Sequence, residues 1–242
     1  MKLEGRVALV TGAGRRVGQA IALALSERGM RVAAHYHESA SGAEETVSRI
    51  RDAGGRADSF RSDLRHVHAC ESLIHDVGES FGALDALVNS AAVMVRTPIG
   101  SVTAAQWDDM FAINLRAPFF CAQAAAGMLG KRGGSIVNIA DLAGLESWPA
   151  YVPHGISKAG VVQMTRSLAR AMAPAVRVNA VAPGAVLLPE DFGEAETAHL
   201  ERTTPLGRIG TPRDVADAVV YLLEADYVTG ETLVVDGGRL VR

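Results

Sequence analysis

The sequence predicts an α/β fold in which a parallel seven-stranded sheet carries helices on both faces, in a doubly wound arrangement. Three observations support this prediction. Short apolar runs rich in β-branched residues alternate with helical patterns, the first run leads into a glycine-rich turn, and no linker, repeat or low-complexity block divides the 242 residues. Regular alternation of this kind is typical of βαβ units and a parallel sheet.

The predicted strands are the apolar runs themselves. In chain order they span Val7–Val10, Arg31–Ala34, Arg56–Arg61, Ala86–Asn89, Ser135–Ile139, Val176–Val181 and Thr232–Val235. Ligands of such sheets bind above the carboxyl ends of the strands. We therefore expect the functional side chains directly after the strands.

The first strand runs into the turn TGAGRRVG, and the helical pattern Gln19–Leu25 follows. A strand, a glycine turn and a helix N-terminus in that order form a phosphate site, because free N–H groups and the positive end of the helix dipole face the ligand. Gly12 permits the sharp turn and Gly18 permits a close approach of helix and strand. This context predicts a single NAD(P)-binding Rossmann domain over residues 1–242, with an ordinary βα turn as the alternative.

Composition and charge exclude several classes of function. The chain is 48% hydrophobic and 21% charged, with a net charge of −3, which indicates a globular protein and does not favour nucleic acid as a partner. No apolar run is long enough to cross a bilayer, and the N-terminus has no signal-peptide pattern. Cys70 and Cys121 lie on predicted helices without metal-ligand spacing, which predicts free buried thiols and no metal site. We expect a cytoplasmic protein that acts on a small molecule and has no membrane partner.

The residues around the second strand favour NADPH over NAD. A fold that prefers NAD usually places a carboxylate where this chain has Tyr36. A cation with neighbouring donors and no acid suits a 2′-phosphate. Glu38 argues against this preference if it points inward, and one of the two loop arginines is expected to be only a solvated residue. The expected donors are Arg15, Arg16, His37 and Ser39.

Polar and small residues follow the next strands. Asp63 can accept from an adenine amino group, although capping the next helix is the alternative. Asn89 can bridge neighbouring strands, and the small residues Ser90–Ala92 let a flat ring lie against the backbone. Asn114 is a poor helix former inside the helical pattern Trp107–Ala126, which predicts a polar role or a side chain turned to water.

Further short motifs complete the pattern. They are Thr11-Gly12 with Gly18, Asp63-Leu64, Asn89-Ser90-Ala91, Asn114, Ser157-Lys158-Ala159, Pro183-Gly184, Val228-Thr229-Gly230 and Asp236-Gly237-Gly238. In order and spacing the chain resembles the short-chain dehydrogenase/reductase family over essentially its whole length. The resemblance implies hydride transfer between NAD(P)(H) and a carbonyl, alcohol or imine, and a homotetramer or homodimer. The cofactor-binding residues it implies are Gly12, Arg15, Arg16, Val17, Gly18, His37, Ser39, Asp63, Leu64, Asn89, Ala91, Lys158, Pro183, Gly184 and Val186.

Two positions of the family's catalytic set differ in this chain. The family has a Tyr four residues before its Lys, and a Ser that polarises the carbonyl. Here His154 stands at the Tyr position and Asp141 at the Ser position, whereas Asn114 and Lys158 match. The expected catalytic residues are therefore Asn114, Asp141, His154 and Lys158.

The carboxylate at position 141 also narrows the resemblance. Pteridine reductases and the related dihydromonapterin and dihydrofolate reductases are similar in having an Asp there, an Arg at position 16 and a His-Tyr-His-like segment after the second strand. They also have an aromatic residue at the position of Tyr151. A carboxylate suits a ring rich in N–H donors and can relay a proton to a ring nitrogen.

His154 and Lys158 are expected on one face of a helix. A neutral imidazole is a poorer acid than the usual Tyr, and Lys158 disfavours imidazolium, but the charge of Asp141 favours it and makes an Asp–His proton relay feasible. Tyr151 is the obvious substitute phenol, but it lies three residues upstream of His154. Pro153 favours a helix that begins there, so Tyr151 would need a local rearrangement to reach the same place. Asn114 is expected to hold water that connects Lys158 to solvent.

These observations lead to an NADPH-dependent short-chain reductase of a C=N or C=O bond, with a pterin as the candidate substrate. Residues 185–210 are expected to form a lid over that substrate. One alternative is a 3-oxoacyl or general ketone reductase with an altered proton donor. The other is a nucleotide-binding family member with impaired catalysis.

Overall fold

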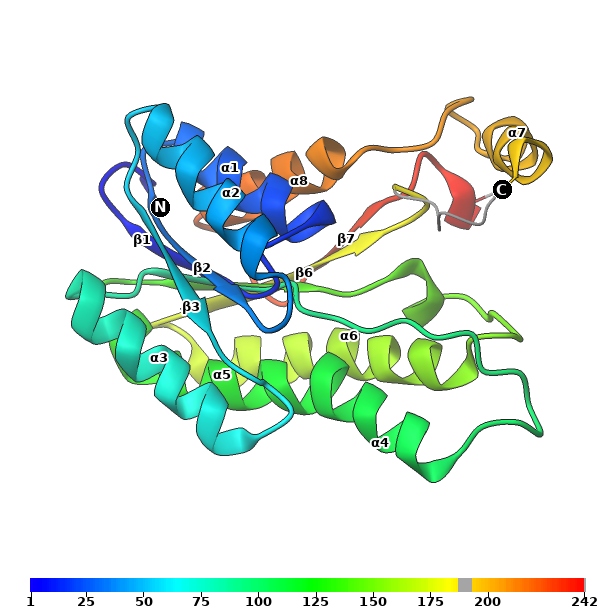
Figure 1. Cartoon of the computed structure of the whole chain (residues 1–242), viewed down its shortest axis with the longest axis horizontal. Helices are drawn as coiled ribbons and strands as arrows, with labels where there is room; N and C mark the ends of the chain where they lie inside the picture. The colour runs from blue at the N-terminus through cyan, green and yellow to red at the C-terminus, as the bar shows by residue number, and fades with distance from the viewer. Residues whose placement is uncertain (187–192, 242) are drawn as a thin grey trace.

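A computed structural model describes residues 1–186 and 193–241. Its sheet has seven strands in the order β3-β2-β1-β4-β5-β6-β7, and every pairing is parallel (Figure 1). The strands are β1 (Val7–Val10), β2 (Arg31–Tyr36), β3 (Ala57–Arg61), β4 (Ala86–Asn89), β5 (Ser135–Ile139), β6 (Arg177–Pro183) and β7 (Thr232–Val235). The predicted fold is confirmed.

All seven predicted strands are present, with small differences at their ends. β2 continues to Tyr36 because that residue still pairs with Arg61 of β3. β6 continues to Pro183, which pairs with Val235 of β7. Arg56 lies just before β3, although its carbonyl accepts a hydrogen bond of 2.9 Å from the N–H of Val32.

Two layers of helices cover the sheet (Figure 1). α1 (Arg16–Glu27), α2 (Ala40–Asp52) and α8 (Pro212–Glu224) lie on one face. α3 (Val67–Phe81), α4 (Ala104–Phe111), α5 (Ala117–Gly130) and α6 (Val152–Met172) lie on the other. α7 (Glu194–Thr203) lies beyond the sheet, close to the C-terminus.

β1 shows why the strand sequences are continuously apolar. Successive side chains of a strand point to opposite faces, and both faces of this sheet are covered by helices. Ala8 and Val10 accordingly pack in the core beneath α1 and α8, whereas Val7 and Leu9 pack in the core beneath α3 and α5. All four are fully buried.

The helical pattern Trp107–Ala126 is not one regular α-helix. α4 ends at Phe111, a π-helical turn spans Ala112–Arg116, and α5 then continues. The wider turn contains Asn114, whose side chain is buried. Wide turns of this kind often occur at functional sites. The prediction of a solvated asparagine is wrong, and the prediction of a polar role stands.

Two further expectations concern buried thiols and membrane spans. Cys70 on α3 and Cys121 on α5 are buried and free, as predicted. Among the described residues, no helix combines the length and apolar character that a membrane crossing requires.

Candidate active site

The glycine turn after β1 is as tight as its sequence predicts. Gly12 has φ +69°, and a Cβ added there would lie 3.0 Å from the Cα of Ala91. A Cβ on Gly18 would collide with the carbonyl oxygen of Gly12. Only glycine fits at both positions because the backbone of the turn packs so closely, and the N–H groups of Gly12 and Ala13 already donate to His35.

Arg16 begins α1 in a conformation that glycine usually adopts. Its φ is +54°, which costs a non-glycine residue about 1 kcal/mol. The N-cap residue Arg15 makes no side-chain capping bond, and the first turn of α1 contains no acidic residue. The positive end of the helix dipole is therefore not neutralised by the helix itself, which suits an anionic ligand.

His35 accepts a hydrogen bond from the glycine turn and was not among the expected site residues. The N–H of Gly12 donates to Nδ1 of His35 over 3.1 Å, so the ring proton sits on Nε2 and is donated to the carbonyl of Ser62 over 3.0 Å. Burial lowers the pKa of His35 from 6.5 to about 4. The neutral ring thus ties β1, β2 and β3 together at the edge where a ligand would bind.

Thr11 ties the turn to β4 and was also missed as a site residue. Its Oγ1 accepts hydrogen bonds from the N–H groups of Ser90 (2.9 Å) and Ala91 (3.0 Å). The signal that could have identified both residues is a polar residue at the end of an apolar run: a threonine directly after β1 and a histidine near the end of β2. Side chains of this kind need hydrogen-bond partners when buried.

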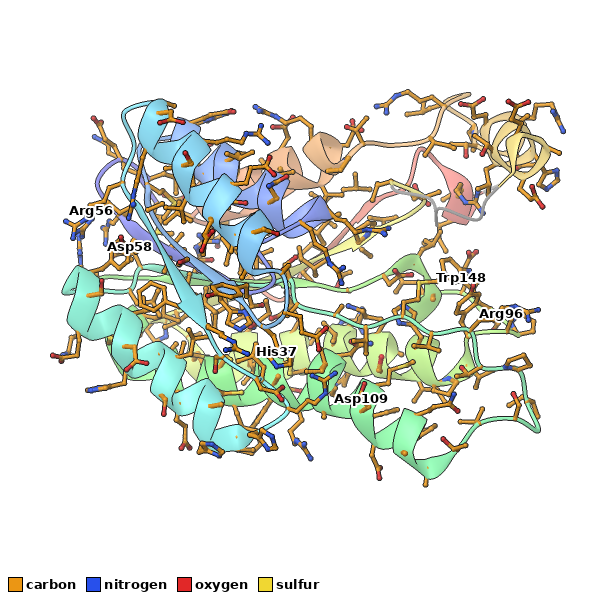
Figure 2. The ribbon with its side chains drawn as sticks, viewed as in Figure 1. His37, Arg56, Asp58, Arg96, Asp109 and Trp148 are labelled. Carbon is orange, nitrogen blue, oxygen red and sulfur yellow. The ribbon has the colours of Figure 1, made fainter. Side chains whose placement is uncertain are left out.

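A charged cluster lies beyond β2 and β3 (Figure 2). His37 Nε2 is 3.7 Å from Asp63 Oδ2, and Arg65 Nε donates to Asp109 Oδ1 over 2.5 Å. Burial raises the pKa of Asp63, but hydrogen bonds from Arg65 outweigh it and hold that pKa below its usual range. Glu38 is 85% exposed and does not point inward. Its Oε1 nevertheless lies 3.7 Å from Nδ1 of His37, one of the expected donors to a 2′-phosphate.

The helix-capping alternative for Asp63 is wrong. α3 begins at Val67 with His66 at its N-cap, and no side chain caps it. Asp63 Oδ1 instead accepts from the backbone N–H of Arg65 over 3.1 Å. The carboxylate therefore stabilises the turn after β3, one turn before the helix.

Asn89 bridges neighbouring strands as predicted. Its Nδ2 donates to Oδ1 of Asn138 on β5 over 2.9 Å, and Asn138 Nδ2 donates to Oγ1 of Thr165 on α6 over 2.9 Å. All three side chains are buried. This chain of hydrogen bonds fixes α6 relative to the ends of β4 and β5.

Asp141 follows β5 and faces α6. Its Oδ1 accepts from the N–H of Ala143 over 2.8 Å and caps a short 3-10 helix, Leu142–Gly144. Its Oδ2 lies 3.6 Å from Nε2 of His154. A Cβ on Gly144 would lie 2.7 Å from the carbonyl carbon of Lys158, so glycine is required for the close approach that brings Asp141 to His154.

Asn114 fixes the other side of the imidazole. Its Oδ1 accepts from the N–H of Val93 (2.8 Å), and its Nδ2 donates to the Val93 carbonyl (2.9 Å) and to Ser157 Oγ (3.1 Å). Nδ1 of His154 lies 3.3 Å from the Val93 carbonyl. Nδ1 also lies 3.4 Å from Nδ2 of Asn114. Because both amide protons of Asn114 have closer acceptors, we assign a proton to Nδ1, which then donates to that carbonyl.

Lys158 lies one helical turn after His154 and is buried. Its Nζ donates to the carbonyl of Ile139 over 2.8 Å. Burial lowers the pKa of Lys158 from 10.5 to about 8, although the charge of Asp141 raises it in part. The hydrogen bonds of Asn114 go to Val93 and Ser157 instead of reaching toward Lys158, so its expected water link to Lys158 remains a prediction.

Tyr151 lies at the N-cap of α6, and its ring packs edge-on against Trp148, with centroids 6.2 Å apart. Trp148 in turn donates to Oε1 of Glu146 over 2.6 Å. Trp148 and Arg96 lie at the same end of the molecule (Figure 2). The expectation that Tyr151 would need a rearrangement to replace His154 stays a prediction.

The remaining expected cofactor residues lie along the same edge of the sheet. Gly184 follows β6 and donates its N–H to the carbonyl of Val235 over 2.9 Å. Val17 and Val186 are partly buried, and Leu64 is fully buried. Of the expected lid, residues 187–192 lie outside the described part. The described part contains α7, none of whose residues is buried.

Comparison with known proteins agrees with this arrangement. The family model described as Enoyl-(Acyl carrier protein) reductase matches residues 12–239. The chain is 37% identical to 3beta-hydroxysteroid dehydrogenase 1 of Eggerthella lenta, over 98% of this chain and 94% of that protein. It is 36% identical to the 3-oxoacyl-(acyl-carrier-protein) reductase FabG of Staphylococcus aureus, over 96% of each protein.

Two solved structures are similar over the whole fold. A mutant short-chain dehydrogenase/reductase of Serratia marcescens has a TM-score of 0.93 at 32% identity, with complete coverage of both chains (100%). A blue fluorescent protein from a metagenomic library, solved in complex with NADPH, has a TM-score of 0.92 at 32% identity, with 99% of each chain covered.

The buried neutral His35 predicts a specific loss of stability in acid. Its folded pKa lies below the ordinary value of 6.5, so the unfolded chain binds a proton first as the pH falls. The contribution of neutral His35 to the free energy of unfolding is complete above pH 6.5 and is lost as the pH falls toward about 4. It amounts to at most about 3 kcal/mol. Urea unfolding at a series of pH values should show this decline, and His35→Asn should flatten it. Parallel curves for the two proteins would contradict the assignment.

Proposed function

The chain belongs to the short-chain dehydrogenase/reductase family, and from that premise we propose that it is an NADPH-dependent reductase of ketone carbonyls. The observation that carries the proposal is the group formed by Asp141, His154 and Lys158 beside the end of β5, on the same edge of the sheet as the glycine turn. The names of the relatives, a hydroxysteroid dehydrogenase and a 3-oxoacyl reductase, favour carbonyl substrates.

Pterin reduction is the second candidate. It is favoured by one observation, the carboxylate of Asp141, whose Oδ2 accepts no hydrogen bond within the described residues and could accept one from a ring N–H. The relatives reported above favour the ketone reductase over this candidate. A substrate panel distinguishes the two.

The residues present fit a dinucleotide. Gly12 and Gly18 let the backbone of the turn pack closely, and the start of α1 has no acidic residue in its first turn and no side-chain cap. Arg16 at the start of α1 supplies a cation and His37 directly after β2 supplies a hydrogen-bond donor, while Tyr36 stands where a fold that prefers NAD usually has a carboxylate. The preference for NADPH rests on these residues and on the NADPH complex of the similar blue fluorescent protein. When bound, the cofactor supplies hydride.

The protein's own groups then handle charge and protons. Lys158 brings a positive charge to the edge of the sheet, which stabilises an alkoxide as it develops on the substrate. Asp141 and His154 provide an acid–base couple in place of a phenol. Asn114 keeps the imidazole in one orientation by fixing the Val93 backbone.

A nucleotide-binding protein with impaired catalysis is the remaining alternative, because His154 replaces a phenol. It predicts that NADPH binds and that no member of a broad panel is reduced. The ketone-reductase proposal predicts turnover of 3-oxoacyl thioesters or 3-oxosteroids, and the pterin candidate predicts turnover of dihydropterins or dihydrofolate. NADPH oxidation, followed by absorbance with each class of substrate, decides among the three.

Arg16 predicts the preference between cofactors. Arg16→Gly should weaken NADPH binding about tenfold, because a charge-assisted hydrogen bond to the 2′-phosphate is lost, and should leave NADH binding nearly unchanged. Its free energy of unfolding should stay within about 1 kcal/mol of the parent, since glycine accepts the positive φ without strain. Fluorescence titration with both cofactors measures this.

The matched control is Arg28→Ala, which removes an exposed arginine beyond the other end of α1, where Arg28 contacts Glu224. It should change neither affinity. Equal weakening of NADPH and NADH by Arg16→Gly would contradict a role in 2′-phosphate recognition.

Lys158 predicts an alkaline limit on activity. As the pH rises through about 8, the buried ammonium loses its proton, and kcat/KM should fall with it. Asp141→Asn should move this limit to lower pH, because the charge of Asp141 raises the pKa of Lys158. The pH profiles of kcat/KM for both proteins measure the effect. A profile that stays flat well above pH 8 would rule out a requirement for the charge.

A further inference from the structure

The two members of the acid–base couple differ in their access to a substrate. The side chain of His154 is 2% exposed, and that of Asp141 is 23% exposed. His154 Nε2 is shielded from solvent and has no hydrogen-bond partner among the described residues. A substrate entering at the edge of the sheet can therefore touch the carboxylate, whereas the imidazole lies behind it.

Both side chains are held in this order. Nδ1 of His154 is directed at the Val93 carbonyl. The Val93 backbone is fixed by Asn114, whose Oδ1 accepts from the Val93 N–H and whose Nδ2 donates to the Val93 carbonyl. Oδ1 of Asp141 is fixed by the N–H of Ala143, which leaves Oδ2 to face Nε2. The distance of 3.6 Å between Oδ2 and Nε2 is a few tenths of an ångström longer than a hydrogen bond.

We propose that Asp141 is the group that exchanges the proton with the substrate and that His154 is a positioning residue and proton source behind it. This inference rests on the proposed carbonyl reduction. It reverses the roles expected from the positions in the chain, because the residue that replaces the family's proton donor does not touch the substrate.

The other titratable groups around the couple do not fit the role as well. Tyr151 packs against Trp148, and Lys158 Nζ donates to the Ile139 carbonyl. Asp141 faces His154 from the end of β5, and Lys158 lies one helical turn further along α6. An imidazole that carries protons on both nitrogens satisfies Val93 on one side and Asp141 on the other.

The proton step balances as follows. When a carbonyl is reduced, its oxygen must gain one proton. The Nε2–H bond of His154 breaks as Oδ2 of Asp141 is protonated, and the new O–H bond of Asp141 breaks as the substrate oxygen gains its proton. A neutral imidazole and a carboxylate remain, and solvent returns a proton to the ring through the exposed carboxylate.

The first experiment distinguishes a residue that touches the substrate from one that only positions its neighbour. Asp141→Asn should lower kcat at least about 100-fold, the usual loss for a proton-transfer group. It should also weaken binding of the product alcohol, measured without turnover, about tenfold. His154→Gln should lower kcat by a smaller factor and should leave the affinity for the product alcohol unchanged. Since the two residues act as a unit, the double variant should be no slower than Asp141→Asn.

A second readout does not depend on activity. The imidazole ¹⁵N shifts of His154 should change in Asp141→Asn and stay constant in Glu146→Gln. The second variant is a control that removes a carboxylate from the same loop. Among the described residues, the Glu146 side chain forms a hydrogen bond only with Trp148. The ¹⁵N measurement can be made even if no carbonyl substrate is found. It therefore tests the contact between Asp141 and His154 separately from the proposed carbonyl reduction.

Three results would overturn the assignment. They are near-normal kcat in Asp141→Asn, weakened product binding in His154→Gln, and a His154 signal that does not respond to Asp141→Asn. Loss of activity in Tyr151→Phe, with normal product affinity in Asp141→Asn, would assign the proton to the phenol instead. Asp141→Asn replaces a partly exposed carboxylate with an amide of the same shape, so the test stands even if His154→Gln does not fold.

Discussion

Parallel pairing of all seven strands places their carboxyl ends at one edge of the sheet, and every candidate functional side chain depends on that placement. Thr11, His35 and Asn89 are buried where β1, β2 and β4 end, and each forms hydrogen bonds to a neighbouring strand or loop. Hydrogen bonds within the protein therefore fix this edge, and they need no ligand. Rigidity of this kind is what positions reacting groups accurately.

This rigidity requires that polar groups be buried with partners. His35 stays neutral because its two nitrogens serve one donor and one acceptor. The amide of Asn114 is satisfied by Val93 and Ser157. Among the described residues, His154 Nε2 has no such partner, although Oδ2 of Asp141 lies 3.6 Å away. A buried polar atom without a partner costs free energy, which the facing carboxylate of Asp141 can offset.

Two residues of the candidate site are in conformations or environments that reduce the stability of the folded protein. Arg16 keeps a positive φ that glycine would adopt freely, and Lys158 keeps an ammonium in a buried place where its charge is disfavoured. Strain and buried charge of this kind occur most often at functional sites. The two residues lie at opposite parts of the candidate site, the first at the phosphate turn and the second beside Asp141.

The sequence by itself determined the sheet, because fully buried strands must be apolar on both faces and glycines must occupy the tight turn after β1. It also identified Asp141, His154 and Lys158, since their spacing departs from a known pattern at recognisable positions. Only the tertiary structure decided which of these groups a substrate can reach. Burial of His154 behind Asp141 depends on the close packing of Gly144 against α6, a contact between segments that spacing along the chain does not encode. The roles of His35 and Thr11 were decided in the same way, because their partners come from other strands and loops.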